Sequence, residues 1–238
     1  LRHGFLGRAH GLGAGTFDLA TIRDRLIQAG ECADAVLAAR QVHGAHVLSP
    51  EHPAFAHLDW ADRGEHLPAA DALVTASAGV LLTIRTADCV PVLLVAPGSR
   101  AVAAVHAGWR GALAGVVENA VAALAERYGA RPAAIQAAIG PAIGGCCYEF
   151  GVEHFVGFVS RYGEEARAAW TPPGADPARG HLDVRTLVDL ALRRSGLDPA
   201  AIHAVGPCTA EVPETLHSYR RDGPHAGRQL SYVGWQPA

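Results

Sequence analysis

Residues 80–129 read VLLTIRTADCVPVLLVAPGSRAVAAVHAGWRGALAGVVENAVAALAERYG, and this stretch decides the fold. It holds three runs of aliphatic residues, at 80–84, 90–95 and 101–105, and Pro97-Gly98 marks a turn between the last two. Because their apolar character is continuous rather than alternating, we expect strands that are buried on both faces.

A helix is predicted after the third strand. Aliphatic residues recur there at helical spacing, and Gly129 is a typical C-terminal stop. These residues are Leu113, Val116, Val117, Ala120 and Leu124. The order is therefore strand, strand, strand and helix, with short polar turns between them.

The rest of the chain adds elements of both kinds. Leu19, Ile22 and Leu26 predict a helix that ends near Gly30, and Asp183 is a suitable N-cap for another helix. The other expected elements are helices around 155–159 and 184–191, strands at 42–48, 134–139, 202–205 and 229–233, and a surface loop at 171–180. Strands and helices mix without strict alternation, and no linker divides the sequence. We therefore predict an α/β (α+β) fold, with residues 1–238 forming a single-domain layered sandwich of mixed β-sheets covered by helices.

Composition excludes several classes of function. The formal net charge is -3 and no basic run is longer than a pair such as Arg220-Arg221, so we expect no nucleic-acid partner. No run reaches the roughly 18 apolar residues of a membrane span, so we expect no membrane partner. Five cysteines, two of them adjacent, do not resemble a secreted disulfide framework and favour a cytoplasmic protein. The chain starts at Leu1 and has no methionine, so we expect its natural start to lie upstream.

Two polar segments interrupt the apolar strands, and each offers a metal ligand. Cys89 and His106 lie at predicted strand ends, where side chains can converge, and His43 offers a third ligand beside a glycine. Zinc accepts thiolate and imidazole, and a catalytic zinc has three protein ligands and an open position. Spacing alone leaves the ordinary alternatives open: a hydrogen-bonded histidine and a cysteine that is simply a small core residue.

A series of short motifs adds a family resemblance. They are Gln-Val-His-Gly (41–44), Thr-Ala-Asp-Cys-Val-Pro-Val (86–92), Ala-Val-His-Ala-Gly-Trp-Arg-Gly (104–111), Ile-Gly-Pro-Ala-Ile-Gly (139–144), Cys-Thr (208–209) and His-Ser-Tyr-Arg-Arg-Asp-Gly (217–223). In this order they resemble the laccase-domain family, long labelled polyphenol oxidases and now regarded as purine nucleoside phosphorylases. The N-terminal block departs from the family pattern, because His10 replaces one glycine of a Gly-Gly pair that follows Arg8.

The resemblance implies a specific site and activity. It implies a layered α/β fold and a zinc ion bound by His43, Cys89 and His106. It also implies phosphorolysis of adenosine, inosine, guanosine and methylthioadenosine, and deamination of adenosine. Some bacterial relatives are linked to editing of a peptidoglycan precursor, a role that would use the same ligands. The expected partners are a purine nucleoside and phosphate, and the oligomeric state stays open.

Candidate substrate contacts follow from these reactions. Phosphorolysis needs a group that holds phosphate, and guanidinium groups offer paired donors, so Arg110, Arg220 and Arg8 are candidates in that order. Each of them is also compatible with an ordinary surface role. Deamination needs a proton donor beside the zinc, which can activate water.

Three further residues complete the candidate set. Gln41 is a candidate substrate contact from the first motif. Asp88 would accept a hydrogen bond from a ligand histidine or would form a turn, and Tyr219 would stack on a purine or pack as an ordinary aromatic residue. The adjacent pair Cys146-Cys147 cannot easily face one metal, so we expect it to be structural.

Three other functions compete with the zinc enzyme. A copper oxidase is disfavoured, because the sequence has no His-x-His pair and no methionine. A metal-free hydrolase would use Cys89 as nucleophile and His106 as base, and would not need His43. A non-enzymatic binding protein would tolerate loss of all three residues.

Overall fold

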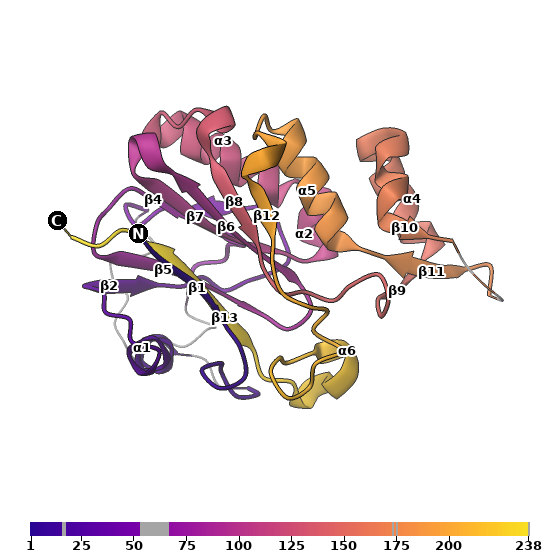
Figure 1. The fold of residues 1–238 in the computed structure, drawn as a ribbon, viewed down its shortest axis with the longest axis horizontal. Helices are drawn as coiled ribbons and strands as arrows, with labels where there is room; N and C mark the ends of the chain where they lie inside the picture. Colours follow the sequence, from indigo (N-terminus) through magenta and orange to yellow (C-terminus); the bar gives the residue numbers. More distant parts are fainter. Residues whose placement is uncertain (16–17, 53–66, 173, 175, 238) are drawn as a thin grey trace.

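The computed structural model describes residues 1–15, 18–52, 67–172, 174 and 176–237. Its described strands form three sheets (Figure 1). The six-stranded sheet has the order β12 (Ile202–Ala204), β8 (Gln136–Ile139), β6 (Val90–Ala96), β7 (Ala101–Ala107), β4 (Ala72–Thr75) and β3 (Val47–Leu48). The four-stranded sheet has the order β1 (Arg2–Leu6), β13 (Gln229–Gly234), β5 (Val80–Thr86) and β2 (Ala35–Leu37). The three-stranded sheet has the order β10 (Trp170–Thr171), β11 (Arg179–Leu182) and β9 (Glu149–Gly151).

Helices cover the outer faces of the two larger sheets. The described helices are α1 (Leu19–Gln28), α2 (Trp109–Ala114), α3 (Val116–Tyr128), α4 (Val152–Tyr162), α5 (Val184–Arg194) and α6 (Tyr219–Asp222). In Figure 1, α3 and α5 lie over the six-stranded sheet, and α1 lies beneath the four-stranded sheet. Both larger sheets contain parallel and antiparallel pairs. The predicted layered α/β sandwich of mixed sheets is thus confirmed.

The continuous apolar runs are buried on both faces, as predicted. Along β6, Val92 and Leu94 belong to the core beneath the helices, whereas Leu93 and Val95 belong to the core between the two larger sheets. Successive side chains of a strand point to opposite faces, so a central strand between two apolar layers needs no polar position. A third core lies between α1 and the four-stranded sheet.

The helix predicted after β7 is two helices. Gly115 ends α2 and precedes α3, with a φ of 92° in the left-handed region. A Cβ atom at this position would lie 2.6 Å from Nη2 of Arg161. The break therefore needs glycine for its backbone conformation and for the close approach of Arg161.

Two other predicted elements differ from the structure. The expected strand at 42–48 is reduced to β3, because the backbone N–H groups of Val42, His43 and Gly44 donate to the carboxylate of Asp71 instead of to a strand. The expected loop at 171–180 begins in β10 and ends in β11, which pair with each other.

The remaining predictions need small shifts of boundary. The strand predicted at 134–139 begins at Gln136, after a 3-10 turn over Pro132–Ala134. Asp183 caps α5 by accepting a hydrogen bond from the N–H of Arg185, as predicted. Among the described helices, none has the length and apolar character needed to cross a bilayer.

Candidate active site

The strand register brings Cys89 and His106 to one end of the space between the two larger sheets. Pro91 of β6 pairs with His106 of β7. His106 lies on the same face of β7 as Val102 and Ala104, which pack between the sheets. Cys89 precedes β6 by one residue and shares the parity of Leu93 on that same face. Neighbouring antiparallel strands therefore place a thiol and an imidazole side by side.

Asp71 holds the third residue, His43, against this pair. Its Oδ1 accepts from the backbone N–H of His43 at 2.9 Å, and its Oδ2 accepts from Gly44 at 2.7 Å and Val42 at 3.2 Å. His43 has a φ of 59°, a left-handed conformation that costs free energy in a residue other than glycine. The hydrogen bonds to Asp71 offset this cost and fix the direction of the side chain.

The three side chains can converge on one metal ion. One ligand atom from each of His43, Cys89 and His106 lies within 4.8 Å of the other two. The two imidazole rings meet edge to face, with centroids 4.9 Å apart. Nδ1 of His106 lies 2.8 Å from Oδ1 of Asp71, which leaves Nε2 available to an ion. A carboxylate behind a ligand histidine is the usual way in which proteins orient such a ligand.

Charges in this group favour the metal-binding form of the cysteine. Burial alone would raise the pKa of Cys89, but the charge and hydrogen bonds of His106 and His43 lower it to about 6. Burial would lower the pKa of His106, but Cys89 and Asp71 raise it to about 9. Burial likewise acts to raise the pKa of Asp71, yet its hydrogen bonds hold it below the usual value. In the absence of metal, these shifts therefore favour the thiolate of Cys89 and the imidazolium of His106.

Gly108 supplies the space that the side chains of His43 and Cys89 need. A Cβ atom built there would lie 2.8 Å from Cδ2 of His43 and 3.0 Å from Sγ of Cys89. The backbone of Gly108 has a φ of -70°, which alanine adopts freely. Alanine at this position would therefore act on the two side chains rather than on the backbone.

We expect Gly108→Ala to lower zinc affinity at least about 10-fold, since a displacement of ligand side chains acts as strongly as the loss of a supporting hydrogen bond. Competition with a coloured chelator measures this affinity. Gly98→Ala is the matched control, because a Cβ atom there meets nothing within 4 Å. Equal zinc affinity in the two variants would contradict this account of Gly108.

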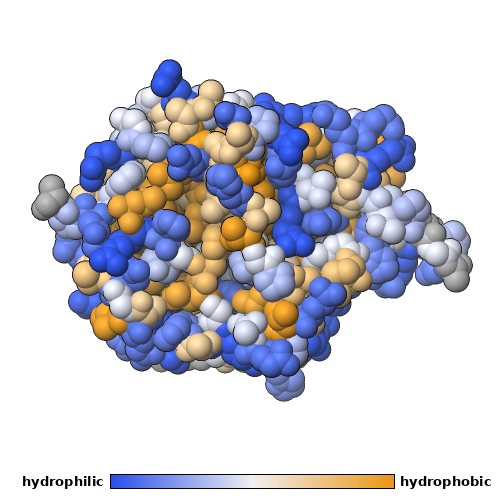
Figure 2. Space-filling view, viewed as in Figure 1, coloured by the Kyte–Doolittle hydropathy of each residue, from blue (hydrophilic) through white to orange (hydrophobic). Residues whose placement is uncertain are grey.

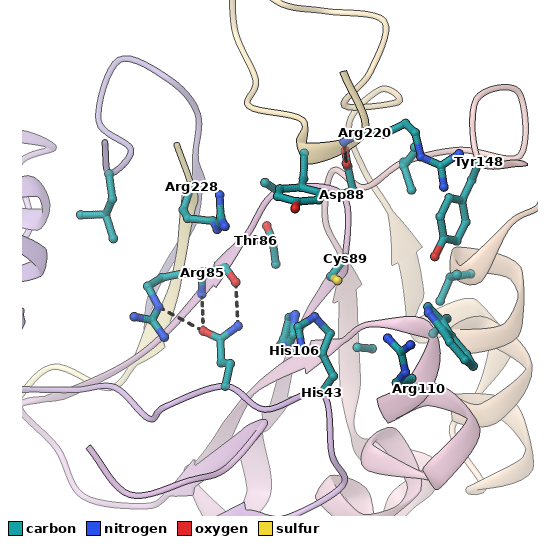
Figure 3. Close-up of a pocket in the computed structure, with 18 of the residues that line it drawn as sticks. His43, Arg85, Thr86, Asp88, Cys89, His106, Arg110, Tyr148, Arg220 and Arg228 are labelled. Atoms are coloured by element: carbon teal, nitrogen blue, oxygen red, sulfur yellow. Dashed lines mark hydrogen bonds between the residues drawn. The ribbon is translucent and has the colours of Figure 1, made fainter. Parts of the chain in front are cut away.

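A cavity of about 690 Å³ opens beside the three residues (Figure 3). Its lining includes Arg85, Arg110, Arg220 and Arg228, and Asp88 is the one carboxylate among the described lining residues. This excess of guanidinium groups favours an anionic ligand. The cavity has the volume typical of sites for small molecules. On the face seen in Figure 2, hydrophilic residues occupy much of the periphery and hydrophobic residues gather toward the centre and left.

Most of the predicted substrate contacts line this cavity: Gln41, Asp88, Arg110, Tyr219 and Arg220. The amide of Gln41 is already engaged, because it donates to the backbone O of Arg85 at 2.7 Å and accepts from its N–H at 2.9 Å. The guanidinium of Arg110 lies 4.3 Å from the ring centroid of Trp109. Trp109 thus lies beside the site, where its ring supports Arg110.

Asp88 does not bond a ligand histidine, which was one of the two roles considered for it. Its carboxylate accepts from Oγ1 of Thr209 and from the backbone N–H of Arg220, both at 2.6 Å. The carboxylate that bonds a candidate ligand histidine is that of Asp71. Asp88 has a φ of 87°, and these bonds connect the turn before β6 to the start of α6.

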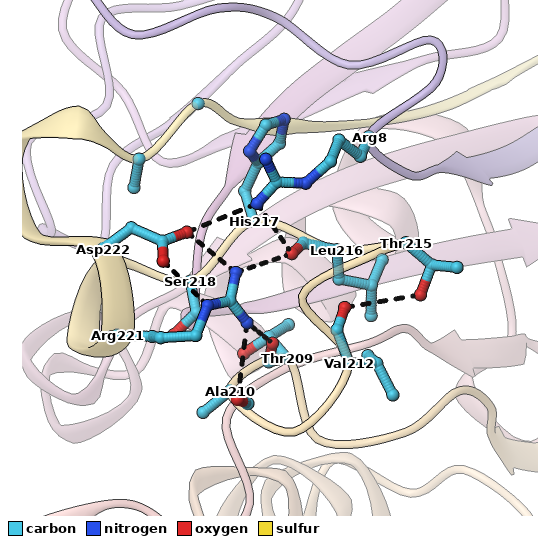
Figure 4. A network of polar contacts seen from close by, with 12 residues as sticks. Arg8, Thr209, Ala210, Val212, Thr215, Leu216, His217, Ser218, Arg221 and Asp222 are labelled. Carbon is cyan, nitrogen blue, oxygen red and sulfur yellow. Dashed lines mark hydrogen bonds and ion pairs between the residues drawn. The ribbon is translucent and has the colours of Figure 1, made fainter.

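Arg8 is not brought to the cavity lining. Its Nη2 lies 3.4 Å from Oδ2 of Asp222 and 3.5 Å from the backbone O of Leu216 (Figure 4). In the same network, the guanidinium of Arg221 donates to the backbone oxygens of Thr209 and Leu216, each at 2.9 Å. This network stabilises the segment between β12 and α6.

Sequence reasoning missed Asp71, Arg85, Tyr148 and Arg228. Asp71 carried a signal, because it is a single carboxylate at the start of an apolar run, and its side chain is fully buried. Arg85 also carried one, as a charged residue at the end of the buried run of β5. Tyr148 and Arg228 reach the cavity from distant parts of the chain, and no local pattern marks them.

Several known proteins are similar to this chain in sequence or in structure. The purine nucleoside phosphorylase of Xylella fastidiosa (strain Temecula1) is 38% identical over 197 residues, which cover 82% of this chain and 71% of the relative. The purine nucleoside phosphorylase of Deinococcus radiodurans is 34% identical over 250 residues and covers 98% of this chain and 88% of its own length. The crystal structure of YlmD from Geobacillus stearothermophilus superposes with a TM-score of 0.82 at 29% identity, over 99% of this chain and 92% of that one.

The family model described as multi-copper polyphenol oxidoreductase laccase matches residues 13–236. This match includes each residue of the group that could bind a metal and nearly all of the fold described above. Together with the relatives, it shows that the chain belongs to this laccase-like family.

Proposed function

We propose that the protein is a zinc-dependent purine nucleoside phosphorylase that accepts adenosine, inosine, guanosine and methylthioadenosine, and that it also deaminates adenosine. The observation that carries this proposal is the convergence of His43, Cys89 and His106 beside an arginine-rich cavity. Relatives named purine nucleoside phosphorylase, at 38% and 34% identity, support the reaction class.

The donor set suits zinc. One thiolate and two imidazoles are ligands of catalytic zinc sites, where a fourth position stays open. His43 is exposed and Cys89 is half-buried, so the open side would face the cavity. A zinc ion bound here would supply Lewis acidity. A site with several copper ions has less support, because this group offers three ligands.

Phosphate would bind to the guanidinium groups of the cavity. Arg110 and Arg220 enter it from α2 and α6, and each lies over an aromatic ring: Trp109 at 4.3 Å and Tyr148 at 4.8 Å. Stacking restricts a guanidinium group, so less entropy is lost when it holds phosphate in two hydrogen bonds. We assign phosphate to these two arginines and leave Arg8 out, since it pairs with Asp222.

The purine would lie near the tyrosines. Tyr219 is 53% exposed and lines the cavity, which leaves its ring free to stack on a base. Burial and the charge of Cys89 raise the pKa of Tyr148 to about 12, so its hydroxyl keeps its proton at neutral pH. It would donate a hydrogen bond to the departing base, which needs a proton or a donor as the glycosidic bond breaks. We place the reaction in the cytoplasm, where the five free thiols stay reduced.

Incubation of the purified protein with adenosine, with and without phosphate, tests both activities. We expect adenine and ribose 1-phosphate only when phosphate is present, and inosine in either case, with products separated by chromatography. Arg220→Ala should raise the KM for phosphate about 10-fold or more, by the loss of a charge-assisted pair of hydrogen bonds. Arg193→Ala is the control, since Arg193 pairs with Asp189 on the exposed face of α5.

The outcomes separate this proposal from its alternatives. If neither adenine nor inosine forms, the nucleoside reaction is wrong, and editing of a peptidoglycan precursor becomes the leading function for this site. The thiolate–imidazolium pair of Cys89 and His106 favours one second candidate, a metal-free cysteine hydrolase. Turnover that survives chelation but is lost when Cys89 is alkylated would establish that candidate.

A further inference from the structure

A second group of potential metal ligands lies outside the candidate active site. It consists of Cys146, Cys147 and Cys208, whose sulfur atoms all lie within 4.8 Å of one another. Two of them are adjacent in the chain, and sequence reasoning expected that such a pair could not face one ion. The structure brings both thiols to the same point, together with a third from 61 residues further along.

A tight turn explains this convergence. The N–H groups of Cys147 and Tyr148 both donate to the backbone O of Gly144, each at 3.0 Å, which curls the chain around the pair. Cys208 is held beside the turn, because the next residue, Thr209, donates from its N–H to the backbone O of Ala142 at 3.1 Å. These backbone bonds thus bring the three cysteines together.

The chemistry of the group favours a soft cation. Its three donors are sulfur atoms, and thiolates select ions such as Cu(I), Zn(II) and Cd(II) over hard ions. The backbone N–H of Gly144 donates to Sγ of Cys208 at 3.2 Å, a bond that stabilises a thiolate. Cys208 is buried, Cys147 is half-buried and Cys146 is exposed. An ion can therefore reach the group from solvent on the side of Cys146.

A positive group lies beside the cluster. A Cβ atom built on Gly144 would lie 3.3 Å from Sγ of Cys146 and 3.2 Å from Nη2 of Arg185. The sulfur and the guanidinium therefore lie on the same side of Gly144. Arg185, whose Nε also lies 3.7 Å from Oδ1 of Asp183, would offset part of the excess negative charge of three thiolates around one cation.

We propose that Cys146, Cys147 and Cys208 form a second metal site, which binds a thiophilic d10 cation through three thiolates. This site is separate from the candidate active site and does not depend on the proposed reaction. Each bound cation displaces the protons of the three thiols. Because thiolates are the form that binds the cation, binding should strengthen as the pH rises.

The proposed site is connected to the cavity. Ile143, just before the turn, lines the cavity and donates from its N–H to the backbone O of Asp88 at 3.0 Å. Thr209, next to Cys208, donates to the carboxylate of Asp88 at 2.6 Å. A cation that joins the two segments would therefore hold both of them against the residue that precedes Cys89.

Cadmium is a suitable probe, because cadmium–thiolate bonds absorb in the ultraviolet. The test uses the full chain with Cys89→Ala, which removes the sulfur of the other site, under reducing and oxygen-free conditions. We expect titration to reach about one Cd(II) per chain with strong thiolate absorption. Adding Cys146→Ser should abolish most of this absorption, and adding Cys32→Ser should leave it unchanged. Cys32 is exposed and lies apart from both groups, so it is the matched control.

Three outcomes would overturn the proposal. The first is an absence of thiolate absorption in the Cys89→Ala protein. The second is absorption that persists after Cys146→Ser and also after Cys208→Ser, provided that both proteins give the circular dichroism spectrum of the folded chain. The third is the formation of a disulfide within the cluster on exposure to air, detected by mass spectrometry, in a protein that takes up no cadmium when reduced.

Discussion

Replacing Cys89 by alanine should abolish both zinc binding and nucleoside turnover. Cys89 supplies the one thiolate of the group, and its low pKa, about 6, keeps it deprotonated at neutral pH. The two remaining imidazoles would be too few to hold the ion, because catalytic zinc sites use three protein ligands. We expect zinc content at this site to fall from about one ion per chain to almost none. The rates of adenosine phosphorolysis and deamination should both fall to the rates measured in buffer without enzyme.

Elemental analysis and the adenosine assay measure these two effects on the same preparation. Cys32→Ala is the matched control, since it removes an exposed thiol far from the cavity. Because the thiol cluster can also bind zinc, both proteins should carry Cys146→Ser during the metal measurement. Full turnover in the metal-free alanine variant would refute the zinc enzyme, and it would exclude the cysteine hydrolase as well.

The fold was predictable where a local sequence pattern reflects the position of an element in the layered structure. The continuous apolar runs of β5, β6 and β7 follow directly from burial on two faces, and Asp183 is a local cap signal for α5. The segment after Gln41 was not predictable from its apolar residues. Its backbone binds the carboxylate of Asp71, 27 to 29 residues away, and a local pattern carries no sign of such a partner.

The site was predictable only in part, for a related reason. The motifs identified His43, Cys89 and His106 through a resemblance, whereas their spacing left ordinary core residues as alternatives. The structure adds two features that let these three side chains meet. One is the register of β6 against β7, and the other is the absence of a side chain at Gly108. The thiol cluster was not predicted, because adjacent cysteines share one face only in a tight turn, and this turn closes on the backbone O of Gly144.

Asp71 should be the most sensitive residue outside the ligands themselves. Its two oxygens accept four N–H groups: Oδ1 from His43 and His106, and Oδ2 from Val42 and Gly44. Asn in its place keeps the shape but turns one acceptor into a donor. Whichever way the amide is oriented, its NH₂ group then faces two N–H donors, at a position where the side chain is fully buried.

We expect Asp71→Asn to lower zinc affinity about 10- to 100-fold, as the loss of a carboxylate behind a ligand histidine does in other zinc sites. It should also lower the free energy of unfolding of the metal-free protein by about 3–5 kcal/mol, the usual cost of breaking a buried charged pair. Chelator competition and urea denaturation measure the two quantities. Asp189→Asn is the control, because Asp189 pairs with Arg193 on the exposed face of α5 and should change stability by less than about 0.5 kcal/mol.

The two measurements distinguish a positioning role from a merely structural one. If Asp71 only stabilises the fold, zinc affinity measured well below the unfolding temperature should equal that of the unmodified protein. If it positions the ligands, affinity should fall even in fully folded protein, because the ring of His106 loses its fixed orientation and the segment that carries His43 loses its anchor. Unchanged affinity would therefore reject Asp71 as the residue that assembles the site, but would not test the proposed role of Cys89 as a ligand.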